Sequence, residues 1–248
     1  MLLKGKTAVL TGCNRGIGRA VLALFAQHGA NIWACVRKET EEFVSLAREL
    51  SKQYRVTITP VYFDFGDEEQ IKAGLKVILA SKSHVDILVN NAGVVPSSQP
   101  FHMTSIGDMK KTFDINFFAQ MLITQYISRI MAKKKSGSIV NISSIAGMDG
   151  NPAQLEYVAS KSAMIGATKK LAIELGTMGI RVNAVAPGLT DTDMIEKMDN
   201  DFMKKNIDKV IMKRLGRPEE IAAVVLFLAS ELSSFITGEV IRVDGGRV

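Results

Sequence analysis

The stretch Thr7-Ala8-Val9-Leu10-Thr11-Gly12-Cys13-Asn14-Arg15-Gly16-Ile17-Gly18 joins a short apolar run to a glycine-rich turn and the start of a helical pattern. The run predicts a strand over 7–10, and the following periodicity predicts a helix over 16–28. Glycines at such a junction allow a tight turn and a close approach of backbone to a pyrophosphate, whose charge is favoured at a helix N-terminus. The stretch therefore predicts a dinucleotide-binding turn. Its Gly-x-x-x-Gly-x-Gly spacing departs from the commoner Gly-x-Gly-x-x-Gly, so a turn that only connects two elements is the alternative.

The same alternation of strand and helix runs through the rest of the chain. Apolar runs predict further strands at 31–36, 57–63, 86–90, 138–142, 181–186 and 240–243. Helical periodicity predicts helices at 39–53, 68–81, 105–132, 155–177 and 218–230, with a short one within 194–208. Continuous apolar strands suit a parallel sheet that is covered on both faces. We therefore expect one domain over residues 1–248, an α/β Rossmann-type doubly wound parallel sheet of about seven strands flanked by helices.

Composition and charge limit the class of protein. The 248 residues are 47% hydrophobic and 23% charged, which excludes a disordered chain. The apolar runs are too short to span a bilayer, and no signal-peptide pattern precedes the first strand. Two cysteines fit a reducing compartment, so we expect a cytoplasmic protein without membrane insertion. The net charge is +6, but the basic residues are scattered and no aromatic residues lie between them. This pattern is typical of solvent-exposed helix ends and does not favour nucleic-acid binding.

The residue after the second predicted strand distinguishes the two nicotinamide cofactors. Chains that bind NAD carry an acidic residue about 20 positions beyond the glycines, where it binds the ribose 2′-hydroxyl. Here that position holds Arg37, and Arg15 lies in the glycine-rich turn. A guanidinium can hold a 2′-phosphate that a carboxylate would repel. The pattern predicts NADP(H), and the alternative is that Arg37 is an exposed loop charge.

A serine, a tyrosine and a lysine predict acid–base chemistry. Ser144 follows the fifth strand, Tyr157 comes thirteen residues later, and Lys161 four residues after that. Residues i and i+4 share one face of a helix, so we expect the Lys161 ammonium beside the Tyr157 phenol. A neighbouring cation lowers a phenol pKa, which makes the group useful for general acid–base catalysis. Histidine, cysteine and carboxylate residues show no metal-ligand spacing, so no metal is expected.

Taken together, these motifs resemble those of the short-chain dehydrogenase/reductase superfamily over essentially the whole chain. Asn90-Asn91-Ala92-Gly93 is similar to the family segment that lies against the cofactor, and Asp64 resembles its adenine-contacting acid. The resemblance implies a catalytic tetrad, and the spacing to Tyr157 selects Ser144 over Ser143 in it. The tetrad is Asn116, Ser144, Tyr157 and Lys161. The implied cofactor contacts are Gly12, Asn14, Arg15, Gly16, Ile17, Gly18, Arg37, Asp64, Phe65, Asn91, Ala92, Gly93, Tyr157, Lys161, Pro187, Gly188, Thr190 and Thr192.

The resemblance implies an NADP-dependent oxidoreductase that acts on CH–OH groups. Hydride from NADPH reduces a ketone while Tyr157 protonates the developing alkoxide. Lys161 binds the nicotinamide ribose and lowers the pKa of Tyr157, and Ser144 donates a hydrogen bond to the substrate oxygen. The resemblance implies that Asn116 binds a water molecule in a proton relay. The alternative is that Asn116 marks a local helix kink in which its amide is hydrogen-bonded, and the two interpretations are compatible.

Within the superfamily, the chain most resembles the 3-oxoacyl-(acyl-carrier-protein) reductases of fatty-acid synthesis, through the stretches 88–93, 185–188 and 214–222. This implies reduction of a 3-oxoacyl thioester, a homotetramer packed through the helices 105–132 and 155–177 and the last strand, and a mobile substrate lid over about 189–214. Lys135 occupies the position of one family arginine that docks the acidic carrier protein. Met178 replaces a second one, so carrier docking stays open, with Lys169 and Lys170 as compensating charges.

Two other functions stay open. A sugar, polyol or small-ketone dehydrogenase of the same fold, for example in surface-polysaccharide biosynthesis, shares most of these motifs. A non-catalytic NADP-sensing protein has no need of Tyr157 and Lys161 together. The loop 94–102 reads as substrate-specific, with His102 as a polar contact or an ordinary loop residue. The segment 194–212 is rich in methionine, which predicts a surface that adapts to an apolar ketone. The alternative is a helix that packs on the core.

Overall fold

Seven parallel strands form one sheet in the computed structural model, which describes residues 1–96, 98–150, 154–193 and 200–246. Their order across the sheet is β3-β2-β1-β4-β5-β6-β7. The order reverses between β1 and β4, and in doubly wound sheets nucleotides bind outside the carboxyl ends of the strands at such a point. The strands are β1 (Thr7–Thr11), β2 (Asn31–Val36), β3 (Ile58–Tyr62), β4 (Ile87–Asn90), β5 (Gly137–Ile142), β6 (Ile180–Pro187) and β7 (Val240–Val243).

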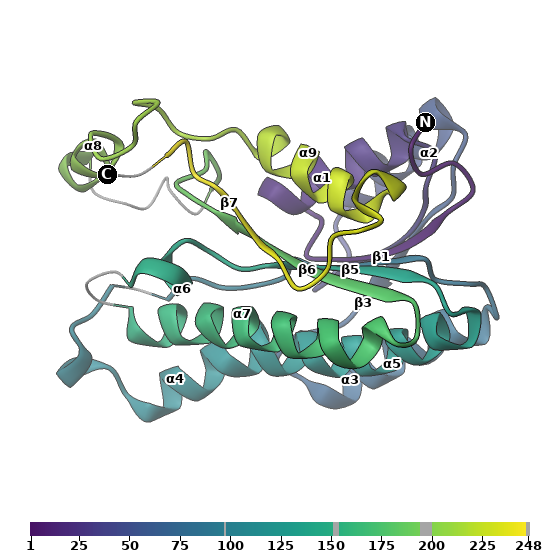
Figure 1. Cartoon of the computed structure of the whole chain (residues 1–248), viewed down its shortest axis with the longest axis horizontal. Coiled ribbons are helices and arrows are strands. Elements are labelled where there is room, and N and C mark those ends of the chain that lie inside the picture. Colours follow the sequence, from purple (N-terminus) through teal and green to yellow (C-terminus); the bar gives the residue numbers. More distant parts are fainter. Residues whose placement is uncertain (97, 151–153, 194–199, 247–248) are drawn as a thin grey trace.

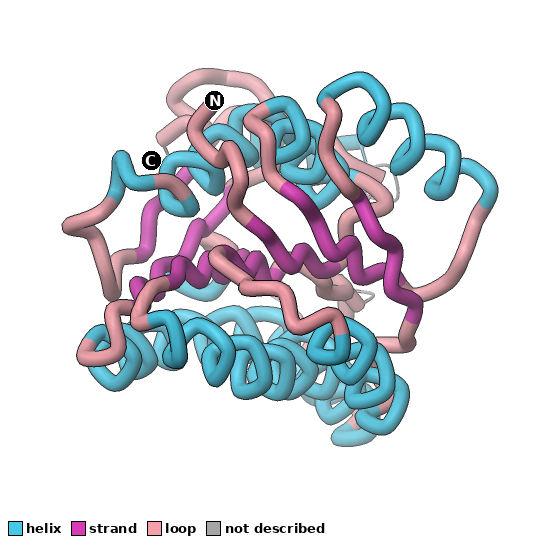
Figure 2. The backbone as a smooth tube through the Cα atoms, turned by 90° about the vertical axis from the view of Figure 1, so that its right-hand side faces the viewer, coloured by secondary structure: helices cyan, strands magenta, loops and turns pink. Residues whose placement is uncertain are grey.

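Two layers of helices enclose the sheet (Figures 1 and 2). One layer holds α1 (Gly16–Gln27), α2 (Glu41–Tyr54) and α9 (Pro218–Ala229). The other holds α3 (Glu68–Ala80), α4 (Ile106–Phe113), α5 (Ala119–Lys134) and α7 (Leu155–Gly176). Two short helices, α6 (Ala146–Asp149) and α8 (Asn200–Ile207), lie at the left of Figure 1, toward the carboxyl ends of the strands. The remaining turns are η1 (Phe101–Met103), the π-helical η2 (Asp114–Phe118) and η3 (Glu231–Ser233).

Alternate residues of each strand pack against opposite helix layers. Leu10 and Val89 belong to the core beneath α1, α2 and α9, whereas Val9 and Leu88 belong to the core beneath α3, α5 and α7. Successive side chains of a strand point to opposite faces, so a central strand with helices on both sides must be apolar throughout. This is why the strands appear in the sequence as continuous apolar runs.

The predicted fold class is confirmed, and all seven predicted strands end within one residue of the observed bounds. The predicted helix over 105–132 is wrong in one respect, because η2 interrupts it and separates α4 from α5. The sequence analysis also missed α6. Within the described ranges, the structure contains no helix with the length and apolarity needed to cross a membrane.

Candidate active site

The glycine-rich turn lies between β1 and α1, packed directly against the segment that follows β4. Gly12 and Gly16 have positive φ angles of 66° and 52°. A Cβ atom on Gly12 would lie 2.7 Å from the Cα of Ala92. A Cβ atom on Gly18 would overlap the carbonyl oxygen of Gly12 and lie 2.5 Å from Asn91 Nδ2. The turn therefore leaves no room for side chains where backbone must approach a ligand.

The first turn of α1 differs from those of the other helices around it. Thr40, Asp67 and Ser105 cap α2, α3 and α4 with side-chain oxygens. No side chain of the described residues caps α1, and its first turn carries no acidic residue. Its N-terminal N–H groups and the helix dipole thus remain available for an anion such as a pyrophosphate. Within this turn Asn14 and Arg15 are exposed, and Ile17 packs on the core.

Hydrogen bonds join the turn after β1 to the segment after β4. The Thr11 hydroxyl oxygen accepts from the backbone N–H groups of Asn91 and Ala92, at 2.9 and 3.0 Å. The Asn91 side chain donates to the carbonyl oxygens of Thr11 and Gly12, at 3.0 and 2.9 Å. These bonds join the two segments at the reversal of strand order, where doubly wound folds have their ligand crevice.

Arg37, Asp64 and Phe65 lie farther along the same edge, after β2 and β3. The Arg37 side chain is exposed, which suits a cation that binds a phosphate. The Asp64 carboxylate accepts from the N–H of Gly66 at 2.8 Å, and Phe65 is buried against Phe63, with 4.9 Å between the ring centroids. A positive and a negative group thus follow neighbouring strands at the end of the crevice.

The loop after β6 reaches back to the glycine-rich turn. Pro187 ends β6, and Gly188 packs so closely on Asp244 that an added Cβ would lie 2.6 Å from the Asp244 Cβ. The Thr190 hydroxyl donates to the Gly188 carbonyl at 3.0 Å, and Thr192 contacts the position that a Gly16 side chain would occupy. The predicted cofactor residues of β1, β4 and β6 are therefore brought to one place.

Ser144, Tyr157 and Lys161 meet at the carboxyl end of β5. Tyr157 and Lys161 lie in the first two turns of α7, and the Lys161 Nζ is 5.8 Å from the centre of the Tyr157 ring. The Tyr157 side chain forms a hydrogen bond with Ser144. The Lys161 ammonium is buried and donates to the carbonyl oxygen of Ile142 at 2.9 Å. Burial lowers the pKa of Lys161 to about 8.

The expected effect of Lys161 on the Tyr157 pKa is wrong for this structure. Burial raises the pKa of the Tyr157 phenol above its ordinary value of 10.0, and the hydrogen bond from Ser144 only partly opposes that rise. The burial of a phenol disfavours its charged form more than this hydrogen bond favours it. Tyr157 is therefore a protonated phenol near neutral pH, the form that can act as a general acid.

The two adjacent serines have different partners. The Ser143 hydroxyl is buried and donates to the carbonyl oxygen of Lys161 at 2.9 Å, so it is used to hold α7. The Ser144 oxygen accepts a hydrogen bond from the N–H of Ala146 at 3.1 Å, and the Ser144 hydroxyl also forms a hydrogen bond with the Tyr157 side chain. Ser144, the residue selected by its spacing, is thus the serine that faces the phenol.

Asn116 lies in η2 and is 1% exposed. Its Oδ1 accepts from the N–H of Val94 at 2.8 Å, and its Nδ2 donates to the Val94 carbonyl at 3.0 Å and to Ser160 at 3.1 Å. The alternative of a helix kink with a satisfied amide therefore describes this residue well. Because both amide hydrogens are used, a bound water could be held only through the second lone pair of Oδ1.

Lys135 and Met178 lie at the opposite, amino-terminal edge of the sheet. Lys135 is the C-cap of α5, just before β5, and Met178 precedes β6. The two segments are adjacent, because a Cβ on Gly179 would overlap the Lys135 carbonyl oxygen. A strand rises about 3.3 Å per residue, so the six residues of β5 place Lys135 roughly 20 Å from Ser144. Within one chain, Lys135 is not beside the mouth of the site.

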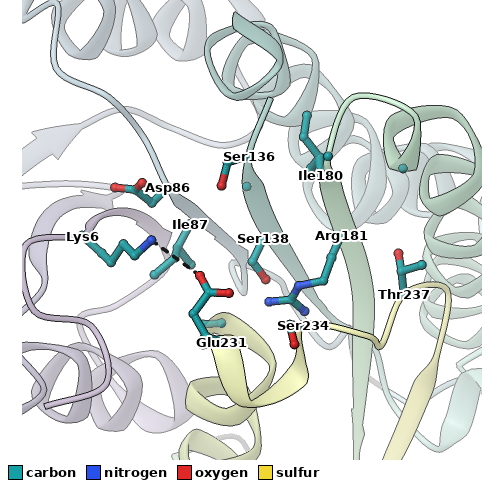
Figure 3. A pocket seen from close by; sticks show the side chains of 14 residues that line it. Lys6, Asp86, Ile87, Ser136, Ser138, Ile180, Arg181, Glu231, Ser234 and Thr237 are labelled. Carbon is teal, nitrogen blue, oxygen red and sulfur yellow. Dashed lines mark ion pairs between the residues drawn. The ribbon is translucent and has the colours of Figure 1, made fainter. Parts of the chain in front are cut away.

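A hollow of about 310 Å³ opens at this amino-terminal edge (Figure 3). Lys6 and Glu231 form an ion pair there at 3.6 Å, and Arg181 donates to the carbonyl oxygens of Leu228 and Ser230 at 2.9 and 3.0 Å. The charged groups of the hollow thus bind one another or the backbone. The convergent groups of the crevice make it the better candidate site.

Sequence reasoning missed Gln154, which begins α7 in a left-handed conformation with φ 57°. Its side chain donates to the Pro96 carbonyl at 3.1 Å and so ties the loop after β4 to the helix that carries Tyr157. In that loop His102 is exposed on η1, and Ser97 lies outside the described residues. Residues 194–199 of the predicted lid also lie outside them, whereas a bridge between Thr190 and Gly216 joins the two ends of that segment.

Comparison with known proteins identifies close relatives. Residues 12–247 match the family described as enoyl-(acyl carrier protein) reductase. A 3-oxoacyl-[acyl-carrier-protein] reductase from Thermotoga maritima is 40% identical over 249 residues, which cover 100% of both chains. A Beutenbergia cavernae structure with bound NADP, assigned as an NAD(P)-dependent gluconate 5-dehydrogenase, has a TM-score of 0.92 at 32% identity and covers 98% of this chain and 97% of its own. A 3-oxoacyl-[acyl-carrier protein] reductase with bound NAD from Brucella melitensis has a TM-score of 0.90 at 32% identity, with coverage of 99% and 92%.

Proposed function

Because this chain belongs to the short-chain dehydrogenase/reductase family, we propose that it is an NADPH-dependent reductase of 3-oxoacyl thioesters. The product is the 3-hydroxyacyl thioester, as in fatty-acid synthesis. The observation that carries this proposal is the meeting of Ser144, Tyr157 and Lys161 beside a glycine-rich turn at the reversal of strand order. The full-length identity of 40% to a 3-oxoacyl-[acyl-carrier-protein] reductase supports the substrate class.

The residues of the crevice fit a dinucleotide cofactor. Gly12 and Gly18 stand where a side chain has no room, so the turn packs closely on itself and on the segment after β4. The uncapped first turn of α1 can bind a pyrophosphate. The exposed guanidinium of Arg37, with Arg15 in the turn, supplies positive charge for a 2′-phosphate. When bound, NADPH supplies the hydride that reduces the carbonyl carbon.

The side chains of the chain carry the proton and position the substrate. Ser144 donates a hydrogen bond to the carbonyl oxygen of the ketone and stabilises the negative charge that develops there. Tyr157 then transfers its phenolic proton to this oxygen, and the resulting phenolate recovers a proton from solvent. A protonated Tyr157 at neutral pH is what its raised pKa provides. The buried ammonium of Lys161 would hold the ribose of the nicotinamide.

Several features of the working enzyme belong to the same proposal. The segment of about 189–214 acts as a substrate lid, which the bridge at its two ends supports. The chain forms a homotetramer, which the exposed apolar side chains of Phe118 in η2 and Ile173 on α7 support. It is cytoplasmic, which the unbridged cysteines Cys13 and Cys35 support. Docking of an acyl carrier protein through Lys135 would require a second copy that brings this residue beside the active site.

A sugar or polyol dehydrogenase is the second candidate. The TM-score of 0.92 to a structure assigned as a gluconate 5-dehydrogenase supports it, since one fold is shared by proteins assigned to different substrates. An NADP-sensing protein without catalysis is the third candidate, and the presence of Tyr157 together with Lys161 argues against it.

The deciding experiment follows NADPH oxidation at 340 nm with acetoacetyl-CoA as substrate. We expect turnover with NADPH, at least about tenfold lower kcat/KM with NADH, and loss of about a thousandfold or more in Tyr157→Phe, because the proton donor is removed. NADPH binding by that variant should stay within about twofold, as measured by fluorescence titration. Turnover that survives in Tyr157→Phe overturns the assignment. Binding of NADPH without turnover directs the search to sugar and polyol substrates.

A further inference from the structure

An ion-pair cluster joins two segments that are 93 residues apart. Arg242 of β7 binds both carboxylate oxygens of Asp149, at the end of α6, with distances of 2.7 and 2.8 Å. The same guanidinium donates to Asp244 through Nε at 3.1 Å and through a terminal nitrogen at 2.8 Å. Two carboxylates therefore hold one planar group along two edges, which fixes its orientation as well as its position.

The helix α6 that Arg242 binds starts immediately behind Ser144. Ser144 accepts from the N–H of Ala146, the first residue of α6, at 3.1 Å. On its other side α6 lies against the catalytic helix, because a Cβ on Gly147 would be only 2.7 Å from the carbonyl carbon of Lys161. The Ser162 hydroxyl adds a bond of 2.8 Å to the Gly147 carbonyl. The short helix is thus held between the backbone of α7 and Arg242.

The second carboxylate connects Arg242 to the loop after β6. Asp244 packs against Gly188 with no space for a side chain between them, and the Gly188 N–H donates to the Val243 carbonyl at 2.9 Å. Gly188 is one of the residues that we assign to the cofactor. Arg242 therefore lies between the segment behind Ser144 and the segment beside the cofactor.

We propose that Arg242 is a positioning residue, which sets the Ser144 hydroxyl against Tyr157 by holding α6 through Asp149. This proposal rests on the proposed function. The side chains of Arg242 and Asp149 are 36% and 35% exposed, so their ion pair contributes little to global stability. Its effect is geometric, and a small displacement of a catalytic group can lower turnover by up to about a hundredfold. Loss of the cluster should therefore lower kcat with little change in the melting temperature.

The test compares Arg242→Gln, Arg242→Lys and Asp149→Asn in the acetoacetyl-CoA assay. We expect Arg242→Gln to lower kcat by about tenfold or more while the KM for NADPH stays within about twofold. Arg242→Lys keeps the charge but loses the planar fork, so its kcat should lie between those of the wild type and Arg242→Gln. The kcat loss of the double variant Arg242→Gln with Asp149→Asn should be smaller than the product of the two single losses, because both changes break the contact between Arg242 and Asp149.

Lys6→Gln is the matched control, because it removes a long-range ion pair at the opposite edge of the sheet. Its kcat should equal that of the wild type. The proposal is overturned if Arg242→Gln keeps kcat within twofold of the wild type, or if its kcat loss and that of Asp149→Asn multiply in the double variant.

If the wild-type protein fails to reduce acetoacetyl-CoA, the proposed function is contradicted. The positioning role of Arg242 is then tested by a second measurement that does not depend on activity. Hydrogen exchange of the amides 144–150 should then be faster in Arg242→Gln than in the wild type and unchanged in Lys6→Gln. Equal exchange in all three proteins overturns the positioning role.

Discussion

The ammonium of Lys161 is buried and, among the residues that the structure describes, forms one hydrogen bond, to the Ile142 carbonyl at 2.9 Å. Burial lowers its pKa from 10.5 to about 8, so the folded chain holds this proton less tightly than the unfolded chain. That difference costs the fold roughly 3 kcal/mol at pH 7. Because the folded pKa is the lower one, the cost is fully present below pH 8 and disappears as the pH rises toward 10.5.

Replacement of Lys161 by methionine should stabilise the protein and inactivate it. We expect Lys161→Met to raise the free energy of unfolding at pH 7 by about 1–3 kcal/mol and to lower kcat/KM by about a hundredfold or more. Urea denaturation at pH 7 and at pH 10 measures the first effect, which should shrink at the higher pH. A variant that is less stable than the wild type at pH 7 would contradict this account.

The identity of the site residues was predictable, whereas their interactions were not. The spacing of Ser144, Tyr157 and Lys161, together with the family resemblance, predicted these residues, and the structure brings the three together. Their catalytic roles stay predictions. The direction of the Tyr157 pKa shift was missed, because it depends on how many atoms surround the phenol. Arg242 was missed for a related reason, since its partner Asp149 lies 93 residues away and no local pattern connects them.

At the scale of elements, η2 and the loop after β4 depend on one buried amide. Asn116 binds the N–H and the carbonyl of Val94, and it also binds Ser160 of α7. The side chain thus holds three elements at the edge of the active site. A shorter side chain would leave buried backbone groups without partners, each at a cost of about 1–3 kcal/mol.

Asn116→Ala should therefore lower both stability and activity. We expect a loss of about 2–4 kcal/mol in unfolding free energy and a fall of about tenfold or more in kcat/KM. Asn183 is a matched control, because its buried side chain likewise binds one backbone carbonyl and one N–H, those of Ile236 and Glu239, at 2.9 and 3.1 Å. Asn183→Ala should lose comparable stability and keep its kcat/KM. Equal activity losses in the two variants would remove any special role of Asn116.

Elements whose causes are local were predicted well, and those with distant causes were not. The strands follow from apolar runs, and helices such as α3 follow from periodicity and a capping residue, Asp67. The π-helical η2 arises where the Asn116 side chain binds Val94, a residue 22 positions earlier. The four residues of α6 are too few for a periodic pattern, and their position depends on Gly147 packing against α7.

For the whole molecule, the exposed apolar surface bears on assembly. Phe118, at the end of η2, and Ile173, on α7, are 57% and 72% exposed. Large apolar side chains at helix surfaces gain free energy when a second copy covers them. Their position on the layer of α5 and α7 agrees with the proposed homotetramer.

Light scattering after size exclusion tests this assembly. Four chains of 27.0 kDa give an expected mass of about 108 kDa for the wild type. Ile173→Glu should lower the mass toward that of a dimer or monomer, since it places a charge in the proposed contact. Val77→Glu is the control, because Val77 is 55% exposed on α3, outside that contact. A wild-type mass of one chain contradicts the homotetramer.

The reversal of strand order also separates two parts of the chain that hold different groups of the site. Residues up to Phe65 hold the groups assigned to the adenosine phosphate, whereas Ser144, Tyr157 and Lys161 all belong to the later part, beyond β4. The bonds between Thr11 and Asn91 join the two parts at the site, but the parts also share both apolar cores, for example through Leu22 of α1 and Val225 of α9. Evolution can therefore alter coenzyme preference and substrate preference by separate point substitutions, whereas exchange of a whole part by recombination would disturb both cores.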